Sequence, residues 1–298
     1  MKIRFGQAQR LRAGARRYGP LADLYLRIVG TTSPFALNCY WLLRRTLRHL
    51  DPRPRKILDA GCGKGDFTFA VADLLPEADV LGVDASPAKS HEFAHYEDNI
   101  EVCNELNEIL GMPNVRFEKR DLMNLDESGV FDFIFCIHVL EHIEDNEVVL
   151  QNLAQALKPG GYLYVQMPSR VDLSVKFLEA YLGDRLAWEK AEHIGLLTRD
   201  ELVTKVDATG LEVLRATSEF GYLLTLAWQG REALVQNEQV VLGAALFPVL
   251  KLSTWLHRIL SDRASGLYRR LSLRLTGAPP NTEGNLELLA RKPVEASF

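Results

Sequence analysis

The sequence predicts an α/β protein with a doubly wound, mostly parallel sheet of seven strands. Three observations carry this prediction. Short apolar segments alternate with amphipathic segments of helical length from residue 55 onward. One of them, FDFIFCI at 131–137, is apolar almost throughout, as expected of a central parallel strand. A glycine-rich stretch, GCGKG at 61–65, directly follows the first apolar segment, where doubly wound sheets bind ligands.

The individual elements follow from local patterns. A helix comes first, over 35–50, where apolar residues recur at helical spacing until DPRPR ends the pattern. The predicted strands are 56–60, 79–84, 114–121, 131–137, 161–168, 211–220 and 284–293. The predicted helices between them are 65–75, 87–110, 145–159 and 198–210. The last helix begins at Thr198, a favourable N-cap, and ends at Gly210.

These elements divide the chain into three parts. Residues 1–54 are expected to form a basic helical N-terminal extension. The sheet with its helices takes up 55–220 and 283–293. Residues 221–282 are apolar and helix-like, with basic residues toward their end, and are expected to form a helical insertion before the last strand. The sequence leaves open whether this insertion is a lid over the ligand site, an element resting on a membrane surface, or a homodimer contact.

Composition indicates the compartment. The contents of 47% hydrophobic and 25% charged residues are ordinary for a globular protein. The four cysteines, at 39, 62, 103 and 136, form no C-x-x-C pair, which favours a reducing compartment. The N-terminus lacks the apolar core of a signal peptide, and no segment has the ~20 apolar residues of a membrane-spanning helix. A cytoplasmic protein is therefore expected.

The net charge of −4 hides an asymmetry. Residues 1–56 contain 13 Lys and Arg but only two acidic residues. Residues 251–276 are basic again, with six Lys and Arg and one Asp. Basic ends around an acidic middle favour an anionic partner, including peripheral contact with the inner face of a membrane. A solvated helical surface explains the same pattern equally well.

The stretch ILDAGCGKGDF at 57–67 discriminates between cofactor classes. Dinucleotide-binding enzymes use G-x-G-x-x-G, and P-loops use G-x-x-x-x-G-K-[ST], which does not occur here. In this chain Gly61, Gly63 and Gly65 alternate, and Asp59 precedes them. A carboxylate at that place opposes a pyrophosphate but suits an ammonium group. S-adenosylmethionine carries an ammonium and a sulfonium and no phosphate, so it fits better than NAD.

Two further acidic residues end the next two strands. Asp84 ends VLGVD and can accept hydrogen bonds from both hydroxyls of a ribose. Asp121 ends FEKRD and is placed to meet the amino group of an adenine. Each acid alone is as well explained by a helix cap or a turn. Three acids at three successive strand ends together indicate an adenosine pocket without phosphates.

These motifs resemble those of class I S-adenosylmethionine-dependent methyltransferases that act on small molecules. The matching segments are ILDAGCGKGDF, VLGVD, FEKRDL, FDFIFCIHVLEHI and LKPGGYLYVQMPS. The resemblance implies that Asp59 and the three glycines surround the methionine part and that Asp84 holds the ribose. It implies further contacts with the adenine and with the floor beneath the methyl group, from Ala85, Ser86, Asp121, Leu122, Cys136, Ile137 and His138. It also implies that the last strand runs antiparallel beside the sixth.

A competing motif, HVLEH at 138–142, matches the H-x-x-E-H pattern of one metalloprotease class. Metal binding of that kind needs both histidines on one face of a continuous helix. Because His138 follows an apolar strand and His142 precedes a helix start, the motif is expected to straddle a loop that His142 fixes. His91 and His95 are four residues apart, but a polar helix face explains them better. No metal site is predicted.

Methyl transfer to an oxygen usually needs a general base, and histidine titrates in the right range. His193, in WEKAEHIGLLT, is the first candidate and His138 the second. A structural loop histidine explains His193 equally well. The expected acceptor is a small molecule, of which an anionic or lipid-linked one would suit the basic ends. By analogy it belongs to a cell-surface glycan, lipid or natural-product pathway.

Other functions were weighed against methyl transfer. No RNA-recognition module is found, so nucleic acid is not favoured as the acceptor. A protein that binds the cofactor without catalysis stays open, because intact cofactor motifs do not prove turnover. An NAD-dependent oxidoreductase also stays open, although the glycine spacing and Asp59 oppose it.

Overall fold

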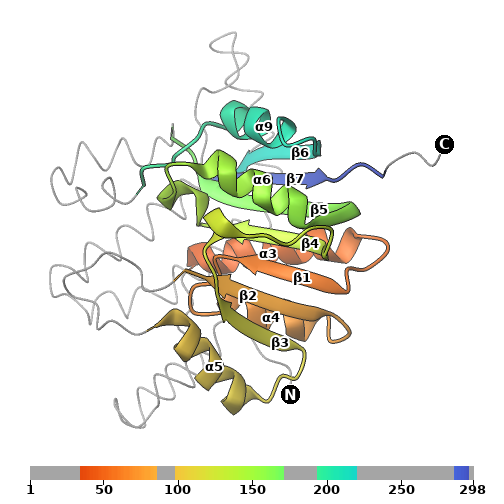
Figure 1. The fold of residues 1–298 in the computed structure, drawn as a ribbon, viewed down its shortest axis with the longest axis vertical. Coiled ribbons are helices and arrows are strands. Elements are labelled where there is room, and N and C mark those ends of the chain that lie inside the picture. Colours follow the sequence, from red (N-terminus) through yellow and green to blue (C-terminus); the bar gives the residue numbers. More distant parts are fainter. Residues whose placement is uncertain (1–33, 86–97, 171–192, 220–284, 295–298) are drawn as a thin grey trace, which may run out of the picture.

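The structure, a computed structural model, describes residues 34–85, 98–170, 193–219 and 285–294 (Figure 1). Seven strands form one sheet in the order β3-β2-β1-β4-β5-β7-β6. The strands are β1 (Lys56–Ala60), β2 (Asp79–Asp84), β3 (Val115–Lys119), β4 (Phe131–Ile137), β5 (Leu157–Pro168), β6 (Glu212–Glu219) and β7 (Asn285–Arg291). Strand β7 pairs antiparallel with β5 and β6, and the other neighbours are parallel. The doubly wound, mostly parallel seven-stranded sheet and the antiparallel last strand are thus confirmed.

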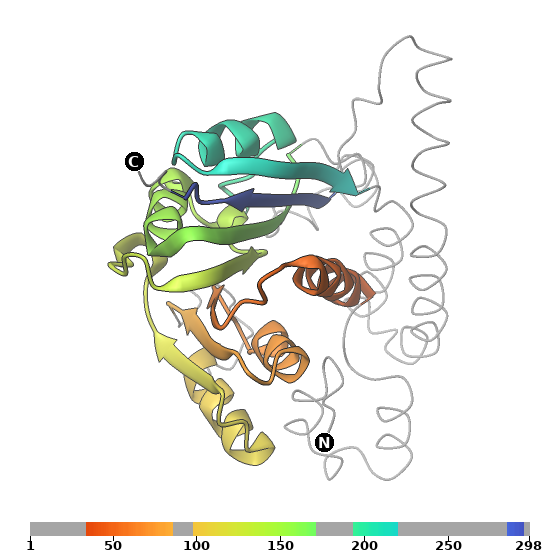
Figure 2. The ribbon, with the colours of Figure 1, turned by 90° about the vertical axis from the view of Figure 1, so that its right-hand side faces the viewer.

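Helices cover both faces of this sheet. They are α3 (Pro34–His49), α4 (Asp66–Leu74), α5 (Asn99–Leu110), α6 (Asn146–Ala156) and α9 (Arg199–Asp207), with short 3-10 helices η2 (Leu122–Asn124) and η3 (Leu140–His142). Side chains alternate along each strand, so Ile57 joins the core under α3, α4 and α5, and Leu58 joins the core under α6 and α9. Figure 2 shows α3 and α4 on one side of the sheet and α6 on the other.

Helix α3 belongs to the core. Its Cys39, Leu43 and Leu47 are almost fully buried and pack in the same cluster as α4 and α5. This part of the predicted N-terminal extension therefore completes one face of the sheet. Residues 1–33, the insertion expected at 221–282, and Ser86, His91 and His95 lie outside the described residues. Within the described part of the chain, no helix is long and apolar enough to cross a bilayer.

The prediction of one helix over 87–110 is wrong, because α5 begins only at Asn99. Asp98 has an extended backbone, and its carboxylate accepts a hydrogen bond from the Ile100 N–H at 2.9 Å. This is an N-cap, which starts a helix and cannot lie inside one. The apolar spacing continued across this point, but the local hydrogen bond of an aspartate overrode it.

Strand β7 is tied to both neighbours by a buried carboxylate. Glu287 is 3% exposed, and its Oε1 accepts hydrogen bonds from the Tyr164 hydroxyl of β5 at 3.0 Å and from Arg215 of β6 at 2.8 Å. A buried carboxylate needs such partners. The same Arg215 guanidinium donates to Thr46 of α3 at 2.9 Å. One polar network thus joins three strands and the helix that covers them.

The strand order reverses between β1 and β4. From β1 the chain continues outward to β2 and β3, and from β4 it continues to β5 on the other side. The connections that follow β1 and β4 therefore lead to opposite sides of the sheet, and this switch point is where doubly wound sheets bind ligands. The loop after β1 is the glycine stretch 61–65, and the loop after β4 is the HVLEH motif at 138–142.

Candidate active site

The glycine loop folds over the end of β2. The N–H groups of Gly61 and Cys62 both donate to the Val83 carbonyl at 2.9 Å. A Cβ on Gly61, whose φ is +83°, would lie 2.3 Å from a methyl carbon of Val139, so only glycine lets the loops after β1 and β4 meet. A Cβ on Gly63, with φ +51°, would meet nothing within 4 Å. Gly63 therefore borders open space in which a ligand can approach the backbone.

Gly65 has a different role from the other two glycines. A Cβ there would lie 3.0 Å from the rings of Phe69 and Phe117. These rings are in edge-to-face contact in the core beneath the loop. The Cys103 thiol, from α5, donates to the Gly63 carbonyl at 3.3 Å. The loop is thus held against the core at one end, while its middle stays open.

Asp84 connects β2 to the glycine loop. Its Oδ2 accepts a hydrogen bond from the Gly63 N–H at 2.8 Å, and Asn99 donates to its Oδ1 at 3.4 Å. Two contacts fix the carboxylate at the strand end, where the sequence places the ribose contact. Ala85 follows it and is exposed. The sequence gives no signal for Asn99, because its approach to Asp84 depends on where α5 begins.

Asp59 is a buried acid beneath the loop. It is 3% exposed, and its Oδ2 accepts a hydrogen bond from the Thr68 hydroxyl at 2.6 Å. Burial, together with the smaller effect of the charge of Asp84, raises the pKa of Asp59 to about 7 against the lowering effect of the Thr68 hydrogen bond. A cationic group beside Asp59 would favour its ionised form. The predicted ammonium of a methionine part is such a group.

The side chains of the remaining predicted cofactor contacts differ in their exposure. Asp121 is exposed at the end of β3 and caps η2, accepting from the Met123 N–H at 2.9 Å and the Asn124 amide at 3.0 Å. The side chains of Leu122 and Cys136 are buried in the core cluster under α6. Any contact of Leu122 or Cys136 with a cofactor must therefore come from the backbone. The Ile137 side chain is 6% exposed and packs on the opposite face.

His138 directly follows β4 and has an unusual backbone conformation. Its φ of +56° is the one positive value among the non-glycine residues that the structure describes. Its ring lies between two partners, with Nδ1 3.0 Å from Glu141 Oε1 and Nε2 3.5 Å from the Cys39 sulfur. Burial lowers the pKa of His138, but its contacts with Cys39 and Glu141 outweigh this and raise it above the ordinary value. Left-handed backbone at a bulky residue is strained, and such strain concentrates at functional sites.

The HVLEH motif straddles a loop, as predicted. His138 follows the strand, Leu140–His142 forms a single 3-10 turn, and α6 begins at Asn146. The two histidines therefore do not share a helix face, which excludes the metalloprotease arrangement. The His142 ring instead meets the ring of His193, with centroids 5.0 Å apart. Glu141 links His138 to this pair of rings. Its Oε1 contacts His138, and a carboxylate oxygen of Glu141 lies near ring nitrogens of His142 and His193.

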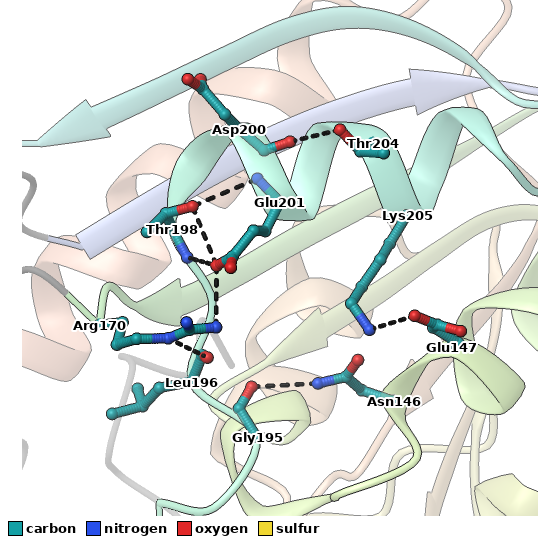
Figure 3. A network of polar contacts seen from close by, with 10 residues as sticks. All are labelled: Asn146, Glu147, Arg170, Gly195, Leu196, Thr198, Asp200, Glu201, Thr204 and Lys205. Atoms are coloured by element: carbon teal, nitrogen blue, oxygen red, sulfur yellow. Dashed lines mark hydrogen bonds and ion pairs between the residues drawn. The ribbon is translucent and has the colours of Figure 1, made fainter.

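The loop that carries His193 is anchored at its far end (Figure 3). Thr198 and Glu201 form the reciprocal hydrogen bonds of a capping box at the start of α9. Arg170 follows β5 and binds both the Glu201 carboxylate at 2.9 Å and the Leu196 carbonyl at 3.1 Å. The N-cap threonine was predicted, but the sequence carries no signal for the Arg170 contacts.

A model of the methyltransferase domain family matches residues 36–216, which is more than half of the chain. The chain belongs to this family. The family match and the methyltransferase relatives identify it as a class I S-adenosylmethionine-dependent methyltransferase, with S-adenosylmethionine as the cofactor. The family match removes the oxidoreductase alternative. The residues present fit this cofactor, because the space at Gly63, the fixed Asp84 carboxylate and the buried Asp59 suit a backbone approach, a ribose and an ammonium group.

Individual relatives cover parts of this methyltransferase. Trans-aconitate 2-methyltransferase of Deinococcus radiodurans is 35% identical over 130 residues, 43% of this chain and 44% of that protein. Ubiquinone biosynthesis O-methyltransferase of Xanthomonas axonopodis pv. citri is 28% identical over 157 residues, 52% of this chain and 60% of that protein. The chain thus spans about half the length of the curated relatives it matches.

The fold is shared with solved methyltransferase structures. Phosphoethanolamine N-methyltransferase 2 of Haemonchus contortus, in complex with S-adenosylmethionine, has a TM-score of 0.58 to this chain. The likeness covers 98% of this chain and 60% of that chain at 19% sequence identity. At this identity the likeness shows the fold, and the acceptor has to be argued from the site itself.

Proposed function

We propose that this methyltransferase transfers the methyl group of S-adenosylmethionine to an oxygen atom of a small-molecule acceptor beside His138. The observation that carries the proposal is the strained backbone of His138 at the end of β4, next to the contact between Gly61 and Val139. The cofactor supplies a methyl group already activated on a sulfonium. The protein therefore has to align an acceptor atom and keep water away, which is work for fixed polar side chains.

Three elements, β5, α3 and β7, bring polar groups together near His138. Its N–H donates to the Gln166 carbonyl of β5 at 2.9 Å, and its ring touches Cys39 of α3. Asn285 of β7 contacts the same Cys39 sulfur at 3.9 Å. The side-chain oxygens of Gln166 and Asn285 are buried and have no hydrogen-bond partner within the described structure. Buried acceptor oxygens of this kind suit a ligand group that donates a hydrogen bond, such as a hydroxyl.

His138 acts on the acceptor side as a hydrogen-bond donor in this proposal. Its side chain is 26% exposed, and its Nε2 lies 3.5 Å from the Cys39 sulfur, a long contact that an acceptor oxygen can replace. The Glu141 carboxylate accepts a hydrogen bond from His138 Nδ1 and holds the ring in place, as a carboxylate does for many functional histidines. The raised pKa of His138 favours this donor role over the base role predicted for it.

The names of two relatives support an oxygen acceptor. One is named for trans-aconitate, a small carboxylate, and the other for O-methylation in ubiquinone biosynthesis. Both are small-molecule oxygen compounds. The base role of His193 stays a prediction and would matter for a hydroxyl acceptor, since a carboxylate needs no deprotonation.

Turnover measurements with substituted enzymes test this proposal. The wild-type chain is incubated with S-adenosylmethionine together with one acceptor, which is trans-aconitate in one reaction and a catechol in another. Methylated product is measured by mass spectrometry. His138→Ala and His138→Asn, which tolerates the left-handed backbone better, are expected to lose roughly 100-fold in turnover while cofactor affinity by calorimetry is unchanged. His49→Ala, at the exposed end of α3, is the matched control. Unchanged turnover in both His138 variants would contradict the proposal.

The wider context of the acceptor also stays a proposal. The basic ends support an anionic or lipid-linked acceptor, a peripheral membrane contact, and a glycan, lipid or natural-product pathway. Most of these basic residues, and the insertion expected to act as lid, membrane element or dimer contact, lie outside the described residues. Sedimentation with anionic vesicles at low salt, reversed by added salt, is the expected result. No vesicle binding at low salt would remove the membrane contact.

A further inference from the structure

Three metal-ligating side chains meet beside the cofactor loop. The donor atoms of Glu141, His142 and His193 all lie within 4.8 Å of one another. Glu141 and His142 come from η3, directly after β4, whereas His193 comes from the loop before α9. The site therefore joins two segments that are distant in sequence.

The backbone around Gly195 fixes the His193 loop against η3. The Gly195 N–H donates to the Glu141 carbonyl at 2.8 Å, and the Asn146 side chain donates to the Gly195 carbonyl at 3.0 Å (Figure 3). A Cβ on Gly195 would lie only 2.2 Å from the Ile143 carbonyl and 2.4 Å from the Leu140 carbonyl. No other residue permits this approach, so the position of His193 is built into the packing of two loops.

Glu141 supplies a second and independent indication of a ligand. The residue is 1% exposed, and its Oε1 is engaged by His138. Its Oε2 is buried and has no hydrogen-bond partner in the described structure. A buried carboxylate oxygen without a partner is costly, and a cation held between this oxygen and two imidazoles would remove that cost.

We propose that Glu141, His142 and His193 bind one divalent transition-metal ion. Two imidazoles and one carboxylate form a donor set that suits Zn²⁺, Mn²⁺, Fe²⁺ or Co²⁺ rather than Ca²⁺ or Mg²⁺. Three protein ligands leave coordination positions open for water or for an oxygen of another molecule. Because Glu141 also holds His138, the ion lies on the side of the crevice where the proposed function places the acceptor.

This site gives His193 a different role from the general base that the sequence suggested. A ring nitrogen that binds a metal cannot accept a proton from the acceptor. The role of His138 is measured as turnover, whereas metal binding can be measured without any acceptor. Failure of the one proposal is therefore distinguishable from failure of the other.

Titration of the metal-free full-length chain with Zn²⁺ and Co²⁺ tests the site. Isothermal calorimetry is expected to give one ion per chain, and the visible absorption of Co²⁺ is expected to report nitrogen and oxygen ligands. His193→Ala and His142→Ala are each expected to weaken binding by more than roughly 100-fold. Gly195→Ala is expected to weaken it too, because the added carbon displaces the His193 loop. His49→Ala, which removes an exposed histidine elsewhere, is expected to bind as the wild type does.

Folding of each variant is checked by circular dichroism and by retained S-adenosylmethionine binding. Since Glu141 is buried, its substitution could unfold the chain, whereas His193 is only half-buried in a loop. The His193→Ala variant is therefore expected to stay folded, so a loss of its metal binding can be assigned to the missing ligand. Absence of Zn²⁺ and Co²⁺ binding in the wild type, or equal affinity in the folded His193→Ala and His142→Ala variants, would overturn the proposal.

Discussion

The loops after β1 and β2 and the loop after β4 face the same crevice but are built in different ways. The cofactor side uses backbone groups and two carboxylates from residues 59–84, close together in sequence. The acceptor side combines His138 and Glu141 with Cys39 and His193, which come from distant elements. The residues expected to hold the cofactor thus form a local motif, whereas the groups proposed to select an acceptor depend on tertiary packing.

The contact between the two sides is where one substitution has the largest expected effect. Gly61→Ala would place a carbon 2.3 Å from Val139 at a φ of +83°, which separates the loops. We expect S-adenosylmethionine affinity to fall by more than roughly 100-fold, measured by calorimetry. Gly129→Ala, at φ +63° with nothing within 4 Å, controls for backbone strain alone. Affinity equal to that of the control would show that the two sides do not depend on this contact.

Removing the carboxylate of Asp84 affects the cofactor side alone. Asp84→Ala deletes the acceptor for the Gly63 N–H and for the ribose hydroxyls, so roughly 100-fold weaker cofactor binding is expected from two lost charged hydrogen bonds. Asp79→Ala, at the other end of β2, removes only an exposed ion pair with Arg116 and is the control. Equal affinity of the two variants would separate Asp84 from the cofactor.

Acidification is expected to weaken cofactor binding through Asp59. Burial raises the pKa of Asp59 to about 7, with Thr68 and Asp84 as the neighbours that modify it, so below this pH the carboxyl is neutral and must lose a proton to bind an ammonium. Affinity should then fall by up to about 10-fold per pH unit below 7. In Asp59→Asn this dependence should disappear, and binding should be weak at every pH.

The raised pKa of Asp59 also predicts how the stability of the cofactor-free protein depends on pH. Without cofactor, the raised pKa of Asp59 means that its contribution to the free energy of unfolding decreases as pH rises from about 4 to about 7. Asp59→Asn removes this effect and is expected to raise the melting temperature at pH 7.5 while lowering cofactor affinity. A lower melting temperature at that pH would mean that the ionised carboxylate stabilises the fold.

The smallest expected effect concerns the anchoring of the acceptor side. Thr198→Ala removes the capping box of α9, at a cost of about 1 kcal/mol in the free energy of unfolding. Thr204→Ala, which removes an exposed hydroxyl from the same helix, is the control. Chemical denaturation measures both. A cost for Thr198→Ala no larger than that of the control would show that the capping box does not stabilise this part of the fold.

The sequence allowed the sheet and the cofactor side to be predicted because their signals are local. Apolar runs mark the strands, and the spacing of Gly61 and Gly63 after Asp59 indicates a cofactor without phosphates. The acceptor side carries no such signal. The contact between Cys39 and His138 depends on how α3 packs, and the contact that only Gly195 permits depends on a loop more than forty residues away from η3.

The position of β7 has a consequence for how the chain folds. Among the strands that the structure describes, β6 pairs only with β7, and β7 fills the space between β5 and β6 only after residues 285–291 have been synthesised. Until then the edge of β5 is open, and Tyr164 and Arg215 lack the carboxylate of Glu287. Pairing across such long sequence separations is slow, and an open strand edge favours aggregation. We therefore expect a chain truncated before β7 to be captured by chaperones or to aggregate, even though every cofactor-binding residue named above precedes the cut.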